Sequence, residues 1–227
     1  MQDKKEETII REISSLVVRQ RMPEGEGPHP VLLLLHGWTG DESVMWVFTR
    51  NLSKRFLMLA PRGIYPAPGG GYGWQEHDGD GWPDYREFTP AIEAILRLLD
   101  PKKFPGGDFS QVYLMGFSQG AALTYTFSLL NPGRVAALAG LSGFMPEGVE
   151  EIIQERPLEG KPVYIAHGSL DELVPVEMAR DAASLLEQAG ARVTYCEEEV
   201  GHKLSAPCFR GLDAFFGRLG LGVGRED

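Results

Sequence analysis

A serine stands between two glycines in the stretch GFSQG at residues 116–120. The pattern G-x-S-x-G is typical of a sharp turn from a strand into a helix, where larger side chains would clash with neighbouring backbone. The apolar run VYLM before it predicts a buried strand, and AALTYTFSLL after it predicts a helix. Ser118 is therefore expected at the carboxyl end of a sheet, beside helix amides that favour negative charge. A serine in that position could act as a nucleophile.

A serine hydroxyl needs a general base, and the base needs an acid that fixes its tautomer. After a turn of this kind the acid comes next in the chain and the histidine last. Of the five histidines, only His167 and His202 lie far enough along. His167 ends an apolar run and is expected to be structural. His202 falls in a loop between the last strand-like run and the final helix, which makes it the expected base.

Asp171 is the expected acid, because HGSLDELVP places it just past the strand that ends at His167. Glu172 is its neighbouring competitor. Asp171 could instead cap the helix that begins near Val176. An earlier acid such as Asp84 would break the chain order.

Acyl transfer also needs backbone N–H groups aimed at the developing oxyanion. One donor is expected from Gln119, the residue after the serine. The other is expected from Trp38, in the loop after the early strand VLLLLHGWTG, where Gly37 lets the backbone approach closely. The alternative interpretation of HGWTG is an ordinary strand-to-helix turn without a catalytic role. The segment can also be such a turn and supply an oxyanion donor.

These residues need a scaffold, and the apolar pattern predicts an α/β fold. Strand-length runs cover residues 12–19, 31–36, 56–60, 111–116, 136–142, 163–167 and 192–197. Several are continuously apolar, which favours a mostly parallel sheet of about seven strands with helices on both faces. Helical faces cover residues 91–99, 176–189 and 212–219. We expect one domain over residues 1–227, with a frayed tail at 220–227.

Residues 61–88 form a long, glycine-rich and aromatic segment without a sustained period. Connections of this length are often binding loops, so we expect substrate contacts here, with a flexible surface loop as the alternative. Ligands of open α/β sheets bind at the carboxyl ends of the strands. The candidate wall residues on this argument are Trp38, Tyr72, Trp74, Trp82, Phe144 and Met145.

The formal net charge of −10 disfavours nucleic acid and anionic lipid as partners. The longest aliphatic run, Val31 to Leu35, is too short to span a membrane, so we expect no stable membrane insertion and a cytoplasmic protein. A homodimer stays open. Cys196 and Cys208 have neither CxxC nor zinc-ligand spacing. We expect them to pack as apolar residues, because a reducing compartment disfavours a disulfide between them.

Six motifs follow one another between about Pro30 and Phe216: LLLLHGWTGDE, LAPRG, GFSQGAAL, LSGFMP, HGSLDELVP and GHKLS. In these motifs and their order the chain resembles the phospholipase/carboxylesterase family of α/β-hydrolases, which includes bacterial carboxylesterases and acyl-protein thioesterases. The resemblance implies an α/β-hydrolase fold and the same assignments of Ser118, Asp171, His202 and the two oxyanion amides. It also implies hydrolysis of small-molecule carboxylic esters with short to medium acyl chains, with no cofactor and no metal.

Other functions stay open beside a serine carboxylesterase. Within the family the alternatives are an acyl-thioesterase and a lysophospholipase. An acyltransferase or a peptidase would use the same triad. A catalytically silent binding protein on the same fold is the alternative from another class.

Overall fold

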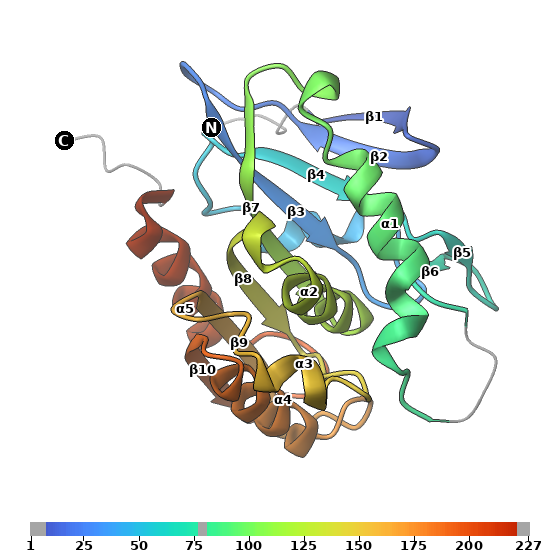
Figure 1. Cartoon of the computed structure of the whole chain (residues 1–227), viewed down its shortest axis with the longest axis vertical. Coiled ribbons are helices and arrows are strands. Elements are labelled where there is room, and N and C mark those ends of the chain that lie inside the picture. The colour runs from blue at the N-terminus through green and yellow to red at the C-terminus, as the bar shows by residue number, and fades with distance from the viewer. Residues whose placement is uncertain (1–7, 77–80, 222–227) are drawn as a thin grey trace.

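A computed structural model describes residues 8–76 and 81–221, except for the side chains of the last two of these residues. Within them, the chain forms an eight-stranded sheet in the order β1-β2-β4-β3-β7-β8-β9-β10 (Figure 1). The pairs from β4 to β10 are parallel, while β1/β2 and β2/β4 are antiparallel. The strands are β1 Thr8–Ile13, β2 Leu16–Arg21, β3 His29–Leu35, β4 Leu57–Pro61, β7 Gly107–Phe117, β8 Val135–Leu141, β9 Pro162–Gly168 and β10 Arg192–Glu198.

The expectation of one strand over residues 12–19 is wrong. This part of the chain belongs to two strands, β1 and β2, which is why the sheet has eight strands and not seven. The chain reverses at Ser14 and Ser15, whose φ angles are 54° and 65°. Both belong to the tight turn of a hairpin between β1 and β2. The four central residues of β1 are exposed, so this edge strand carries no buried face that an apolar pattern could reveal.

Helices cover both faces of the sheet. Buried residues of α1, α2, α3 and α4 share one core, and α5 packs into a second core on the other face. Figure 1 shows α1 and α2 in front of the sheet. The α-helices are α1 Thr89–Leu98, α2 Gln119–Leu130, α3 Glu150–Gln154, α4 Val176–Gln188 and α5 Ala206–Phe216. Short helical turns are η1 Val44–Phe48, η2 Tyr85–Phe88, η3 Pro101–Lys103 and η4 Pro132–Arg134, with a π-helix, η5, at Gly217–Leu221.

The long segment at residues 61–88 has local structure of its own. A small hairpin of β5 (Tyr65–Pro66) and β6 (Tyr72–Gly73) stands apart from the main sheet. The Trp38 ring lies against Gly73, where an added Cβ would come within 2.0 Å of it. The hairpin therefore packs against the loop that follows β3. Residues 77–80 lie outside the described residues.

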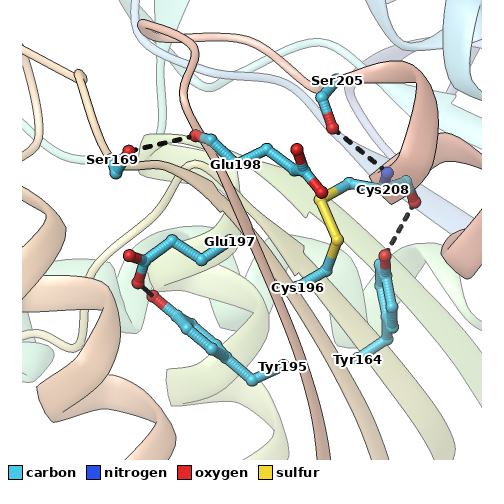
Figure 2. Close-up of a disulfide and its surroundings, with 8 residues drawn as sticks. All are labelled: Tyr164, Ser169, Tyr195, Cys196, Glu197, Glu198, Ser205 and Cys208. Carbon is cyan, nitrogen blue, oxygen red and sulfur yellow. Dashed lines mark hydrogen bonds between the residues drawn. A yellow bond between two sulfur atoms is a disulfide. The ribbon is translucent and has the colours of Figure 1, made fainter.

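The expectation that Cys196 and Cys208 stay unpaired is wrong, because they form a disulfide (Figure 2). Their Cα atoms are 5.7 Å apart, which is within the range for disulfides. The pairing arises because α5 packs on the sheet beside β10, a neighbourhood that the sequence spacing alone does not reveal. The redox argument against a bond rested on the compartment and not on the residues.

Among the described helices, none is both long and apolar enough to cross a membrane. No cluster of three or more histidine, cysteine or acidic side chains in the described ranges could hold a metal ion. Of the expected tail, residues 220 and 221 end η5, and residues 222–227 lie outside the described residues.

Candidate active site

Ser118 occupies the turn between β7 and α2 with φ 54° and ψ −119°. A residue with a side chain persists in such a conformation only where its surroundings enforce it. The flanking glycines make the turn sterically feasible. A Cβ on Gly116 would lie 2.0 Å from the Gly120 carbonyl oxygen, and one on Gly120 would lie 2.1 Å from the Leu35 oxygen. GFSQG therefore has the geometry of the sharp nucleophile turn that its sequence predicts.

Asp171 and His202 are joined by a short hydrogen bond of 2.7 Å between Oδ2 and Nδ1. The other carboxylate oxygen of Asp171 accepts the backbone amides of Leu173 and Val174 at 2.9 and 3.0 Å. The Asp171 side chain is fully buried, so its charge is held in one orientation. Nδ1 of His202 donates this bond in the neutral ring, which leaves Nε2 as the proton acceptor.

His167, the alternative base, lies deeper in the protein. Its Nε2 donates to the Val174 carbonyl at 2.9 Å and lies 3.4 Å from the same Asp171 oxygen that His202 contacts. Burial lowers the pKa of His167. Glu172, the alternative acid, is exposed. Asp171 is not the N-cap residue of α4, because that position is occupied by Pro175.

Ser118 and His202 line one cleft of about 580 Å³. This volume is within the range of roughly 300–1,000 Å³ that is usual for small-molecule sites. A Cβ on Gly37 would lie 3.1 Å from the Ser118 Cβ, so the loop after β3 passes directly beside the serine. Trp38 and Gln119, the two expected oxyanion donors, also line the cleft. The first amides of a helix have no acceptor within it, and Gln119 is the first residue of α2.

Of the six candidate wall residues, the cleft is lined by Trp38, Trp82 and Phe144. The rings of Trp82 and Phe144 are 4.5 Å apart, so they form a continuous aromatic patch. The other three candidates, Tyr72, Trp74 and Met145, are not among the lining residues.

The position of each of these three residues has a physical reason. The Tyr72 ring packs against the Arg62 guanidinium, 4.6 Å from its centroid. Trp74 is fully buried, with its indole N–H donating to the His36 carbonyl at 2.7 Å. Met145 is buried in the core beneath α1 to α4. The aromatic residues of the long segment thus divide between cleft wall and supporting core.

Some cleft residues were missed by the sequence argument. Gln75 is 5 % exposed, and its Oε1 has no hydrogen-bond partner among the described residues. Phe117, within GFSQG itself, contacts the His202 ring at 4.9 Å between centroids. The exposed Leu173 follows the acid by two residues. Phe117 and Leu173 neighbour the predicted catalytic residues in sequence, which is a signal that could have found them. Gln75 lies in the segment at residues 61–88, where substrate contacts were expected without this residue being named. The lining residues that were not among the named wall candidates or catalytic residues are Gly37, Thr39, Gln75, Gly81, Pro83, Phe117, Leu173 and Val174.

His36 fixes the loop that carries Trp38. Its Nε2 accepts the Gly63 amide at 2.8 Å, so its Nδ1 carries the proton and donates to the Gly37 carbonyl, also at 2.8 Å. Trp74 completes the link, because its backbone N–H donates to Oε1 of Gln119 at 2.9 Å. Both segments that supply the expected oxyanion amides are therefore hydrogen-bonded to the long segment at residues 61–76.

We expect the protein to lose stability on acidification through His36. Burial lowers its pKa below the ordinary 6.5, despite the opposing effect of Asp41 and Glu42 nearby. The unfolded chain therefore binds the proton more readily, so the stabilising contribution is complete above pH 6.5 and is lost as the pH falls through the folded pKa. His36→Asn should cost about 1–3 kcal/mol at pH 8 but should weaken the pH dependence.

Urea unfolding of both proteins at pH 8 and pH 5 measures this effect. His167 also has a lowered pKa, and it is present in both proteins, so the difference between the two pH dependences isolates His36. An identical loss of stability between the two pH values in both proteins would contradict the expectation.

Comparison with known proteins places this geometry in a family. The family model for phospholipases and carboxylesterases matches residues 21–216. Acyl-protein thioesterase 1 of Kluyveromyces lactis is 28% identical over 177 residues, which cover 70% of this chain and 76% of that protein. An Oryza sativa subsp. japonica protein named as a probable inactive carboxylesterase is 27% identical over 123 residues, 53% of this chain and 50% of its own.

A solved structure agrees on the fold. The carboxylesterase from Mesorhizobium loti superposes with a TM-score of 0.79 at 22% identity, covering 92% of this chain and 98% of that one. The expected α/β-hydrolase fold is confirmed. Since the family model spans most of its length, this chain belongs to the phospholipase/carboxylesterase family of α/β-hydrolases.

Proposed function

We propose that the protein is a serine carboxylesterase that hydrolyses short- to medium-chain carboxylic esters through an acyl-enzyme. One observation carries this proposal: the buried Asp171 carboxylate holds His202 at 2.7 Å in the same cleft where Ser118 stands at the strained turn. A nucleophile, a base and an acid that orients the base are the parts that nucleophilic acyl transfer requires.

In the first half-reaction, Ser118 Oγ attacks the ester carbonyl carbon while Nε2 of His202 takes the hydroxyl proton. The carbonyl oxygen becomes an oxyanion and accepts hydrogen bonds from the backbone amides of Trp38 and Gln119. Asp171 stabilises the imidazolium that forms. His202 then gives the proton to the leaving alcohol, and the acyl group stays on Ser118.

In the second half-reaction, water attacks the acyl-enzyme with His202 again as the base. Collapse of the second tetrahedral intermediate returns the proton to Ser118 Oγ and releases the carboxylic acid. The protein groups in these steps are Ser118, Asp171, His202 and two backbone amides, so the reaction as proposed uses no cofactor or metal.

The cleft wall favours a small apolar acyl group. Trp82 and Phe144 present aromatic surface, and Leu173 adds an aliphatic side chain at the rim. If these residues bind the acyl chain, longer chains bury more apolar surface and bind more tightly until the cleft is filled. We therefore place the substrate among small-molecule esters. Nucleic acids are disfavoured as substrates, because the net charge of −10 repels their phosphates.

We expect Trp82→Ala to lower kcat/KM for octanoate esters about tenfold more than for acetate esters, since a few lost methylene contacts have this effect. Trp82 is 37% exposed, so its truncation should leave folding intact. Leu130→Ala is the control, because Leu130 is 40% exposed at the end of α2 and does not line the cleft. An unchanged ratio of octanoate to acetate turnover in Trp82→Ala would remove Trp82 from the acyl site.

An acyl-thioesterase or lysophospholipase is the second candidate function. The similarity to an acyl-protein thioesterase of Kluyveromyces lactis favours the first of these. The silent binding protein is disfavoured by the complete set of Ser118, Asp171 and His202, although one relative bears a name marking it inactive.

A substrate panel separates the candidates. The wild-type protein and Ser118→Ala are assayed on p-nitrophenyl esters from acetate to laurate, on the matching acyl thioesters, and on lysophosphatidylcholine. We expect the highest kcat/KM on esters of short or medium chain. Preference for thioesters or for the lysophospholipid would select the second candidate. Specific binding without turnover of any substrate would select the binding protein.

Location and assembly stay predictions. We propose a cytoplasmic protein, an expectation that came from the short aliphatic runs of the sequence. The Cys196–Cys208 disulfide points the other way, because such bonds persist mainly in oxidising compartments. Cell fractionation tests the location, and light scattering tests the homodimer that the sequence left open.

A further inference from the structure

The disulfide joins the two ends of the loop that carries His202. Cys196 lies in β10 and Cys208 in the first turn of α5, at a sequence separation of 12 with His202 midway. Figure 2 shows the sulfur bridge between the strand and the helix. Among the described residues, β10 is an edge strand whose one neighbour in the sheet is β9. The disulfide-closed loop therefore connects an edge strand to the first turn of a helix.

The loop contributes little to the apolar core. None of the residues at 192–207 is buried, and Cys208 is the first buried side chain after Ala191. Segments with few buried apolar contacts open locally more easily than the core does. His202 thus sits in a stretch that burial alone does not fix, although its ring must keep one orientation to act as a base.

Cys208 supplies the firm end of this loop. Its carbonyl accepts the Tyr164 hydroxyl at 2.7 Å, and its amide donates to the Ser205 hydroxyl at 3.2 Å (Figure 2). Tyr164 and Cys208 are 1% exposed and belong to the core beneath α5. The sulfur bridge extends this anchorage to Cys196 and hence to the carboxyl end of the edge strand.

A row of rings links the same helix end to His202. Phe209, next to Cys208, stacks on Phe48 at 5.6 Å between centroids. Phe48 stacks on Phe117 at 5.7 Å, and Phe117 contacts the His202 ring at 4.9 Å. The start of α5 is therefore connected to the base by packing as well as by the covalent bridge.

The acid loop contacts the other part of the His202 loop. Leu170 N–H donates to the Val200 carbonyl at 3.1 Å, and Ser169 N–H donates to Glu198 at 2.8 Å. An added Cβ on Gly168 would lie 2.1 Å from the Val200 oxygen, so the two backbones pass in close contact. A shift of the carboxyl end of β10 would change the position of His202 relative to Asp171.

We propose that the Cys196–Cys208 disulfide is a positioning element for His202: it holds both ends of the loop so that the imidazole stays on Asp171 and faces the cleft. The inference rests on the proposed esterase function and assigns the disulfide a role in turnover beyond stability. It predicts that breaking the bond lowers kcat, because the base is misplaced more often, while KM changes little, because the apolar cleft wall is untouched.

Two experiments test the positioning role: chemical reduction of the disulfide in the wild-type protein, and a double variant that lacks both cysteines. Dithiothreitol supplies two electrons and two protons, the S–S bond breaks into two thiols, and the reagent becomes its cyclic disulfide. Alkylation with mass spectrometry then counts no free thiols before reduction and two afterwards. We expect kcat to fall at least tenfold with KM within twofold, and reoxidation to restore kcat. Cys196→Ala/Cys208→Ala should show the lowered kcat and should not respond to the reductant.

A stability-matched control separates positioning from general destabilisation. Ile92→Ala removes buried side-chain atoms from α1, in the core on the opposite face of the sheet. Assays run well below the lowest Tm of the set. A double variant with a lowered Tm but the wild-type kcat would overturn this inference and would leave the proposed esterase function standing. A kcat loss of equal size in Ile92→Ala would overturn it too. An oxidised wild-type protein without turnover of any ester would overturn the proposed function, and this inference with it.

Discussion

Ser118→Ala is expected to lower kcat on esters by roughly a million-fold, the scale seen when the nucleophile of such a triad is removed. The fold should be unchanged, because Ala keeps the Cβ that the turn already accommodates. Steady-state assays on the preferred ester, with far-UV circular dichroism as the check on folding, measure both. Residual activity within about a hundredfold of wild type would mean that another group performs the attack.

Ser118→Gly is the matched variant. Glycine adopts positive φ without the steric penalty of a side chain, and Ser118 has φ 54°. The variant should be as inactive as Ser118→Ala but more stable, by about 1–3 kcal/mol if the strain at this turn is of ordinary size. A gain in stability coupled to the loss of activity would show that the strain is retained for the function of this residue.

His202→Ala is expected to lower kcat by a similar factor of roughly a million, because the serine loses its base. Asp171→Asn should cost less, on the order of ten-thousand-fold, since it disturbs the tautomer and orientation of His202 and leaves the ring in place. Measurement of kcat and KM for each variant tests this order of effects.

His167→Gln is the control for histidine identity. His167 contacts the same carboxylate at 3.4 Å but lies buried outside the cleft lining. We expect the folded variant to keep kcat within about tenfold of wild type, the range left to a residue without a direct role. A large loss in His167→Gln beside a small loss in His202→Ala would reverse the assignment of the base.

Local sequence predicted the turn at Ser118, because the signature GFSQG and the apolar runs on either side of it are contiguous in the chain. The steric demand on Gly116 and Gly120 acts between elements that the apolar runs already place. The order of acid and histidine along the chain was predictable from the turn itself, because a nucleophile turn of this kind is followed first by the acid and then by the histidine. Residues in short, strongly patterned elements are placed by their own neighbours in sequence.

The walls of the cleft were less predictable. Trp74 and Trp82 lie in one aromatic segment, yet one is fully buried against His36 and the other lines the cleft. Composition does not distinguish them, because Trp74 is placed by a long-range hydrogen bond to the His36 carbonyl and Trp82 by its contact with the Phe144 ring. The bond between Cys196 and Cys208 was missed similarly, since it depends on how α5 packs on the sheet. Long-range contacts of this kind carry no local period.

The central claim is that Ser118 is an activated nucleophile with His202 as its base. The direct measurement is the rate of labelling by a fluorophosphonate probe, with the labelled residue mapped by mass spectrometry, in wild type and in His202→Ala. The account predicts rapid labelling at Ser118 that is lost in the variant. A folded wild-type protein that does not react, or a His202→Ala variant that reacts at the wild-type rate, would contradict it.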